Sequence, residues 1–263
     1  MELLKGQSLL AYVNERGLPL NSSMAANFIM QAARGVGAAH RLGLVHRDLK
    51  PANIWVSESE VAGESELVKV LDFGLVKGAG QVDGVTIQGE AVGTPVYMSP
   101  EQISGRSDVG PPSDVYALGV LLYELVVGKP PFLGETTVDI LKAHLMDPLP
   151  RVTHSVSNDP IPEHFIDVWT SALAKEPSAR FRNADEFRDA LFSGLDSTQS
   201  SELLSVPGSI VPTDARALAS MDTEEFETLE YVKNATGSTY TGAMERERKW
   251  ITVFSARVCD PPG

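Results

Sequence analysis

An apolar run near the middle of the chain constrains the fold more than any other segment. From Val115 to Gly128 the residues are almost all apolar, and Glu124 is the only charged one. The run is shorter than the ~20 residues that a helix needs to cross a membrane. Because it is apolar on all sides, it predicts a helix over 113–127 that is buried at the centre of a helical domain.

Shorter patterns predict the elements around this helix. Residues 43–111 contain two short β-like runs, 54–57 and 68–71, which lie among glycines and prolines. Apolar residues at helical spacing predict the further helices, over 7–15, 22–42, 136–145, 163–174 and 183–192. The expected fold class is therefore mainly α (α+β), with a few short strands.

Composition and charge exclude several partners and environments. Of the 263 residues 43% are hydrophobic, so the chain can bury a core. Its net charge of −13 argues against nucleic acid or an anionic membrane surface as the main partner. The single cysteine, Cys259, cannot form an internal disulfide, and no secretory signal or membrane segment is recognisable. We therefore expect a cytoplasmic protein.

The composition changes near residue 195. Serine and threonine cluster over 197–205, and no later segment keeps a long apolar face. We expect a folded domain over 1–194 and an acidic, flexible tail over 195–263.

The segment 46–53, with the sequence HRDLKPAN, carries the residue types that phosphoryl transfer needs. Asp48 can orient and deprotonate a hydroxyl, Lys50 can contact the moving phosphate, and the amide oxygen of Asn53 can bind Mg²⁺. An Asp-Phe-Gly motif begins at Asp72, directly after the run 68–71, where a carboxylate can hold a metal ion. Each motif alone is a short match.

Together and in this order, these segments resemble the protein kinase superfamily. Residues 93–101 are similar to the end of a kinase activation segment, and 113–119 resemble the start of the central helix F. Residues 175–181 resemble the segment that supplies a late structural arginine. Lys50 in the catalytic loop and Thr94 before a proline resemble Ser/Thr kinases of the bacterial Hanks type. The resemblance covers residues 1–194.

The resemblance implies a role for each residue of these motifs. Asp48 would act as the catalytic base, Lys50 would stabilise the transferring phosphoryl group, and Thr94 would shape the substrate site beside them. Asn53 and Asp72 would hold Mg²⁺, the metal cofactor of the family.

Other matched residues are expected to be structural. Glu101 and Arg180 would form a buried ion pair that holds the activation segment to the lobe. Asp114 would tie the central helix to the backbone of the catalytic loop. His46 would pack as a core residue on the phenylalanine of the Asp-Phe-Gly motif.

The resemblance also suggests control by phosphorylation. Arg47 and Lys77 would form a cationic pocket for a phosphate group, and Thr86 is the candidate phosphosite. The alternative is an unmodified, solvated loop.

The first residues resemble the kinase hinge, which binds ATP. The backbone of Glu2 and Leu4 would meet the adenine edge, Ser8 would approach the ribose, and Trp55 would form the adenine floor. Lys50 and Asn53 would contact the phosphate end of the same nucleotide.

A complete kinase also has an N-terminal lobe with a Gly-rich loop, a strand lysine and a helix-C glutamate. These are missing from this sequence, so we expect a kinase-like C-lobe without the N-lobe β-sheet. The expected function is transfer of the ATP γ-phosphate to Ser/Thr hydroxyls of protein substrates, by an incomplete catalytic lobe. The alternative is a non-catalytic, truncated kinase-like module that binds a partner protein such as a second kinase.

Overall fold

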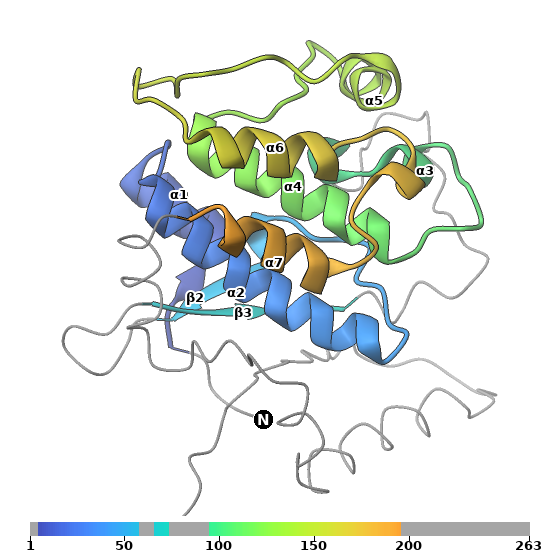
Figure 1. Ribbon diagram of the computed structural model, residues 1–263, viewed down its shortest axis with the longest axis horizontal. Helices are drawn as coiled ribbons and strands as arrows, with labels where there is room; N and C mark the ends of the chain where they lie inside the picture. The colour runs from blue at the N-terminus through green and yellow to red at the C-terminus, as the bar shows by residue number, and fades with distance from the viewer. Residues whose placement is uncertain (1–4, 58–65, 74–94, 196–263) are drawn as a thin grey trace, which may run out of the picture. The chain divides into compact units, whose positions relative to one another are not determined.

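A computed structural model describes residues 5–57, 66–73 and 95–195 (Figure 1). The fold is mainly helical with one small sheet, as the sequence predicts. Its helices are α1 (Leu9–Arg16), α2 (Ser22–Arg41), α3 (Pro100–Ile103), α4 (Pro111–Val127), α5 (Thr137–Met146), α6 (Glu163–Ala172) and α7 (Ala184–Ser193). Its strands are β1 (Gln7–Ser8), β2 (Ile54–Ser57) and β3 (Leu67–Val70), and its short 3₁₀ turns are η1 (Pro51–Asn53), η2 (Pro95–Tyr97) and η3 (Pro177–Ala179).

Helix α4 lies at the centre, with α6 on one side and α2 and α7 on the other (Figure 1). Nearly all of its side chains are buried, which confirms the prediction of a central helix. It begins with two prolines, which suit the first turn of a helix, and ends before Gly128, which adopts a left-handed φ of 95°. Gly119 allows close contact with α6, since a Cβ there would lie 2.8 Å from the Cβ of Ala172.

Helix α2 is amphipathic and packs against α4, α7 and β3. Asn21 caps its first turn, because its side chain accepts a hydrogen bond of 2.9 Å from the Ser23 amide. Its buried face is formed mainly by alanines and larger apolar residues, including Phe28, Ile29 and Val36. None of the helices in the described ranges is long and apolar enough to span a membrane.

The sheet is antiparallel, in the order β1-β2-β3. The sequence pattern predicts a helix over 7–15, but residues 7–8 pair with β2 and the helix begins at Leu9. Ser8 accounts for the difference, because its hydroxyl oxygen accepts a hydrogen bond from the Ala11 amide at 3.2 Å and so caps α1. A strand of two residues is too short to show any periodicity in the sequence.

Candidate active site

The side chains of Lys50 and Asn53 converge on Asp48 in the loop 46–53. Lys50 Nζ donates to Asp48 Oδ2 at 2.8 Å, and Asn53 Nδ2 donates to the same oxygen at 3.2 Å and to the Asp48 main-chain oxygen at 2.7 Å. The Asp48 side chain is 45% exposed and that of Lys50 32%. The carboxylate is therefore held by two neighbours but remains open to a substrate.

The local sequence explains this convergence. Pro51 begins the 3₁₀ turn η1, and the Asn53 amide donates to the Lys50 main-chain oxygen at 2.9 Å. The turn brings the Asn53 side chain into contact with Asp48 before β2 begins at Ile54.

The β2–β3 pair brings Asp72 next to this loop. Ile54 pairs with Val70, and the Leu71 amide extends the pairing with a 2.8 Å hydrogen bond to the Asn53 main-chain oxygen. Asp72 follows directly, with an exposed side chain and a left-handed φ of 55°.

Asn53 and Asp72 carry the types of oxygen atom that Mg²⁺ takes as ligands. The amide nitrogen of Asn53 is engaged with Asp48, which leaves its Oδ1 as the atom that can bind a cation. An amide oxygen and a carboxylate are hard ligands, and Mg²⁺ in nucleotide sites takes only one or two protein ligands besides the phosphates. The described residues contain no cluster of three or more His, Cys, Asp or Glu suited to a metal ion.

His46 joins the catalytic loop to the segment that carries Asp72. The Asp48 amide donates to His46 Nδ1 at 3.3 Å, so the ring proton is on Nε2, which donates to the Leu71 main-chain oxygen at 2.8 Å. The buried ring lies 4.7 Å from the ring of Phe73, centroid to centroid. His46 is thus part of the core and is not placed to act as a base.

The main chain of Arg47 is held by hydrogen bonds at both its amide and its carbonyl oxygen. Arg47 adopts a left-handed φ of 67°, a conformation that costs a non-glycine residue about 1–2 kcal/mol. Its amide donates to Asp114 Oδ1 at 2.8 Å, and its main-chain oxygen accepts from Gln102 Nε2 at 2.7 Å. Helices α3 and α4 therefore both fix the catalytic loop.

Gln102 was not singled out in the sequence, although a signal for it exists. It follows Ser99 by three residues, which is the spacing of a capping box, and its Oε1 accepts from the Ser99 amide at 3.1 Å. The same side chain caps α3 with its oxygen and contacts Arg47 with its nitrogen.

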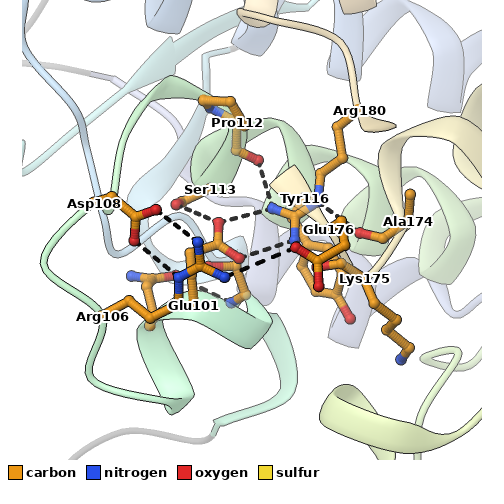
Figure 2. A network of polar contacts seen from close by, with 12 residues as sticks. Glu101, Arg106, Asp108, Pro112, Ser113, Tyr116, Ala174, Lys175, Glu176 and Arg180 are labelled. Atoms are coloured by element: carbon orange, nitrogen blue, oxygen red, sulfur yellow. Dashed lines mark hydrogen bonds and ion pairs between the residues drawn. The ribbon is translucent and has the colours of Figure 1, made fainter. Parts of the chain in front are cut away.

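Glu101 and Arg180 form a buried, two-pronged ion pair (Figure 2). Arg180 Nη1 and Nη2 lie 2.8 and 2.9 Å from the two carboxylate oxygens, and Ser113 Oγ donates to Oε1 at 2.6 Å. Burial alone would raise the pKa of Glu101, but the hydrogen bonds from Arg180 and Ser113 outweigh it and hold the pKa below its ordinary value. The remaining donors of Arg180 are satisfied by the main-chain oxygens of Ala174, Lys175 and Pro112.

Glu124, the charged residue in the apolar run, also has a partner. Tyr97 in η2 donates to Glu124 Oε2 at 2.7 Å. Burial raises the pKa of Glu124, and the Tyr97 hydrogen bond only partly offsets the effect. The sequence analysis assigned no role to either residue, yet together they connect the segment after the activation loop to α4.

The residues expected at the nucleotide site are only partly described. Ser8 and Trp55 are direct neighbours in the β1–β2 pair, and Trp55 Nε1 donates to the Lys5 main-chain oxygen at 3.3 Å. The other sequence-predicted positions lie outside the described residues: Glu2, Leu4, Lys77, Thr86 and Thr94.

Comparison with known proteins identifies the family of the chain. The sequence model of the protein kinase domain matches residues 1–192. The chain therefore belongs to the protein kinase family.

Similar curated proteins include bacterial serine/threonine-protein kinases. PknL of Mycobacterium tuberculosis (strain ATCC 25618 / H37Rv) is 38% identical over 213 residues, which cover 81% of this chain and 49% of PknL. PknB of Mycobacterium leprae is 36% identical over 189 residues, covering 72% of this chain and 29% of PknB. The chain thus spans half or less of the length of these relatives.

A solved structure shows the same fold. The kinase domain of Mycobacterium tuberculosis PknI superimposes with a TM-score of 0.53 at 24% identity, over 74% of this chain and 65% of the PknI chain. This likeness supports the fold only.

Proposed function

We propose that this chain carries the catalytic lobe of a serine/threonine protein kinase, which transfers the γ-phosphate of ATP to hydroxyl groups of protein substrates. The observation that carries the proposal is the grouping of Asp48, Lys50 and Asn53 in one loop, with Asp72 placed beside Asn53 by the β2–β3 pair. The names of the similar bacterial proteins support it.

In this proposal Asp48 orients the substrate hydroxyl and accepts its proton. The hydroxyl oxygen forms a bond to the γ-phosphorus while the bond to the bridging oxygen of the leaving ADP breaks. Lys50 places a positive charge beside the group in transit, and Thr94 helps to shape the substrate site. Bound ATP and Mg²⁺ supply the phosphoryl group and neutralise its charge, and Asn53 and Asp72 are the residues that would hold the metal ion.

The adenine end of ATP is assigned to the hinge. The main chain of Glu2 and Leu4 would meet the base, Ser8 the ribose and Trp55 the lower face of the ring. The pairing of Ser8 with Trp55 in the sheet supports this assignment, because it brings two of these residues together. A Gly-rich loop and a lysine from an N-lobe, or from a partner kinase, would complete the site.

Regulation and location are also proposed. Arg47, which is exposed, and Lys77 would together receive a phosphate group on Thr86. The single cysteine of the chain supports a reducing compartment, and we propose the cytoplasm.

The test compares the chain with its Asp48→Asn variant. We expect saturable binding of ATP in the presence of Mg²⁺, and phosphate transfer to serine or threonine of an added protein that Asp48→Asn reduces at least about a thousandfold. Both proteins are tested alone and fused to an N-lobe of a similar bacterial kinase. Failure of both forms to bind ATP and transfer phosphate would contradict the proposal.

A further inference from the structure

His40, near the end of α2, connects two parts of the fold that are far apart in the sequence. Its side chain is 3% exposed. Its Nε2 lies 2.9 Å from Asp114 Oδ2 in the first turn of α4, and its Nδ1 lies 3.2 Å from the Ala184 amide nitrogen at the start of α7. The ring therefore lies between the helix that holds the catalytic loop and the last described helix.

The hydrogen bonds define the proton position on this ring. A main-chain amide can only donate, so His40 Nδ1 must accept from Ala184 and carries no proton. The ring proton is then on Nε2, which donates to Asp114. The geometry thus assigns the Nε2–H tautomer to His40.

Asp114 depends on this donor. Its carboxylate is 1% exposed, and it accepts from the amides of His46 at 2.7 Å and Arg47 at 2.8 Å as well as from His40. Oδ2 is shared between His46 and His40, whereas Oδ1 accepts from Arg47. A buried carboxylate that loses one donor is less well compensated, so the orientation that serves the two loop amides depends on His40.

The start of α7 is fixed on the same part of α2. Asp185 lies against Gly37, where a Cβ would come within 2.5 Å of its Oδ1, and it forms an ion pair with Arg41. The Ala184 amide is one of the donors that a helix leaves without an internal partner at its first turn, and His40 accepts it. A shift of this turn along α2 would therefore either weaken this hydrogen bond or move the His40 ring with the turn.

We propose that His40 is a positioning residue of the kinase site, which transmits the placement of the first turn of α7 to the catalytic loop through Asp114. The catalytic consequence rests on the proposed kinase function. The connection from α7 through His40 and Asp114 to the catalytic loop rests only on the hydrogen bonds and burial described above. His40 acts through Asp114 and does not contact the reacting groups.

Two substitutions separate the two hydrogen bonds. In His40→Asn the amide oxygen can take the place of Nδ1 and accept from Ala184, but nothing reaches Asp114. In His40→Gln the amide nitrogen can take the place of Nε2 and donate to Asp114, but the acceptor for Ala184 is lost. His154→Gln is the matched control, because His154 is exposed and contacts only its neighbour Thr153 through its side chain within the described residues.

Amide hydrogen exchange of the full chain tests the link without relying on activity. We expect His40→Asn to speed exchange at the His46 and Arg47 amides by about tenfold. We expect His40→Gln to speed exchange about tenfold at Ala184 and, by a smaller factor of about threefold, at His46 and Arg47, because the first turn of α7 no longer holds the side chain that contacts Asp114. An effect of His40→Gln at Ala184 alone would contradict the transmission. His154→Gln leaves all three amides unchanged. Equal effects of the two His40 variants, or no effect of either, would overturn the proposal.

Two further measurements complete the test. In the unsubstituted chain, ¹⁵N NMR of the histidine rings should show the Nε2–H form for His40, and the Nδ1–H form would overturn the proposal even if neither variant folded. For phosphate transfer, His40→Asn should lower kcat about tenfold, more than His40→Gln, with the KM for ATP within about twofold. If both His40 variants show the expected amide exchange but keep the kcat of the unsubstituted chain, the positioning role is rejected. An inactive unsubstituted chain with that pattern would instead count against the proposed kinase function and leave the link standing.

Discussion

Tyr97 and Glu124 are joined by a 2.7 Å hydrogen bond between η2 and the buried central helix. Glu124 is the only charged residue in the apolar run of α4, and burial raises its pKa. The bond therefore secures the segment that follows the activation loop to the centre of the lobe, and it ties that contact to the ionisation of one carboxyl.

We expect Tyr97→Phe to make folding stability more sensitive to rising pH. A carboxyl whose pKa is raised in the folded state contributes stability below its ordinary pKa of 4.5, which is lost as the pH rises through the folded value. Without the Tyr97 donor the folded pKa rises further, so more stability is lost by neutral pH. Urea unfolding from about pH 4.5 to about pH 7 measures this slope. In a Glu124→Gln background, Tyr97→Phe should leave the dependence of the unfolding free energy on pH unchanged. A change there would contradict the assignment of this pH dependence to Glu124.

The ion pair of Glu101 and Arg180 should dominate the stability of the region around α3. Both side chains are at most 1% exposed, so removing one partner leaves a buried charge without compensation. We expect Arg180→Leu to lower the free energy of unfolding by about 3–5 kcal/mol. Thermal and urea unfolding measure the loss, and the double substitution with Glu101→Leu should recover part of it. Arg106→Ala, which affects an exposed pair with Asp108, is the control and should change little.

Glu101 of this ion pair should change the stability with pH in the opposite direction to Glu124. Because the pKa of Glu101 is lowered in the folded state, its contribution is complete above its ordinary value of 4.5 and is lost as the pH falls through the folded value. We expect Glu101→Gln to be less stable at neutral pH and to show a shallower acid unfolding curve than the unsubstituted chain. A curve of the same steepness would show that other carboxyl groups control acid unfolding.

His144 should make a second contribution to acid sensitivity. Burial, with a smaller effect from Lys175, lowers its pKa from 6.5 to about 4. The unfolded chain therefore binds a proton that the folded chain does not, and stability falls as the pH drops from 6.5 toward about 4. We expect His144→Gln to reduce this slope, because glutamine does not titrate. The variant should still fold, since Gln can keep a polar contact with the hydroxyl of Tyr116, which lies 2.9 Å from His144 Nδ1. An unchanged slope with normal folding would exclude His144 as its source.

Gln102 allows its two roles to be separated. Gln102→Glu keeps an oxygen for the Ser99 amide but loses the donor to the Arg47 main-chain oxygen. We expect this variant to retain most of its thermal stability and to lose about fivefold in kcat, since the loop loses one of its two supports. Gln102→Ala, which loses both contacts, should be less stable as well. If both variants have the same kcat as the unsubstituted chain, the contact with Arg47 has no catalytic importance.

Much of the fold follows from periodicity in the sequence. The apolar run predicts the central helix α4, and the amphipathic pattern of 22–42 predicts α2, because burial of one stripe or of a whole helix leaves a clear mark on the residue pattern. The strand β1 could not be predicted, since Gln7 and Ser8 form it only by pairing with the distant β2.

The candidate site divides in a similar way. Asp48, Lys50 and Asn53 are close in the sequence, so their chemistry can be read from one motif. Gln102 and His40 act across 55 and 74 residues, on Arg47 and Asp114 respectively, and only the folded chain brings them to their partners. The residue types alone do not indicate these contacts, because glutamine and histidine also occur at exposed helix positions that make no such contact.

The two-sided support of the Arg47 peptide has a consequence for the order of refolding. The left-handed conformation of Arg47 is unfavourable until Asp114 and Gln102, both distant in the sequence, are in place. Contacts of such long sequence separation form late, after local helices. We therefore expect a refolding chain to recover its helices before it recovers the shape of the catalytic loop.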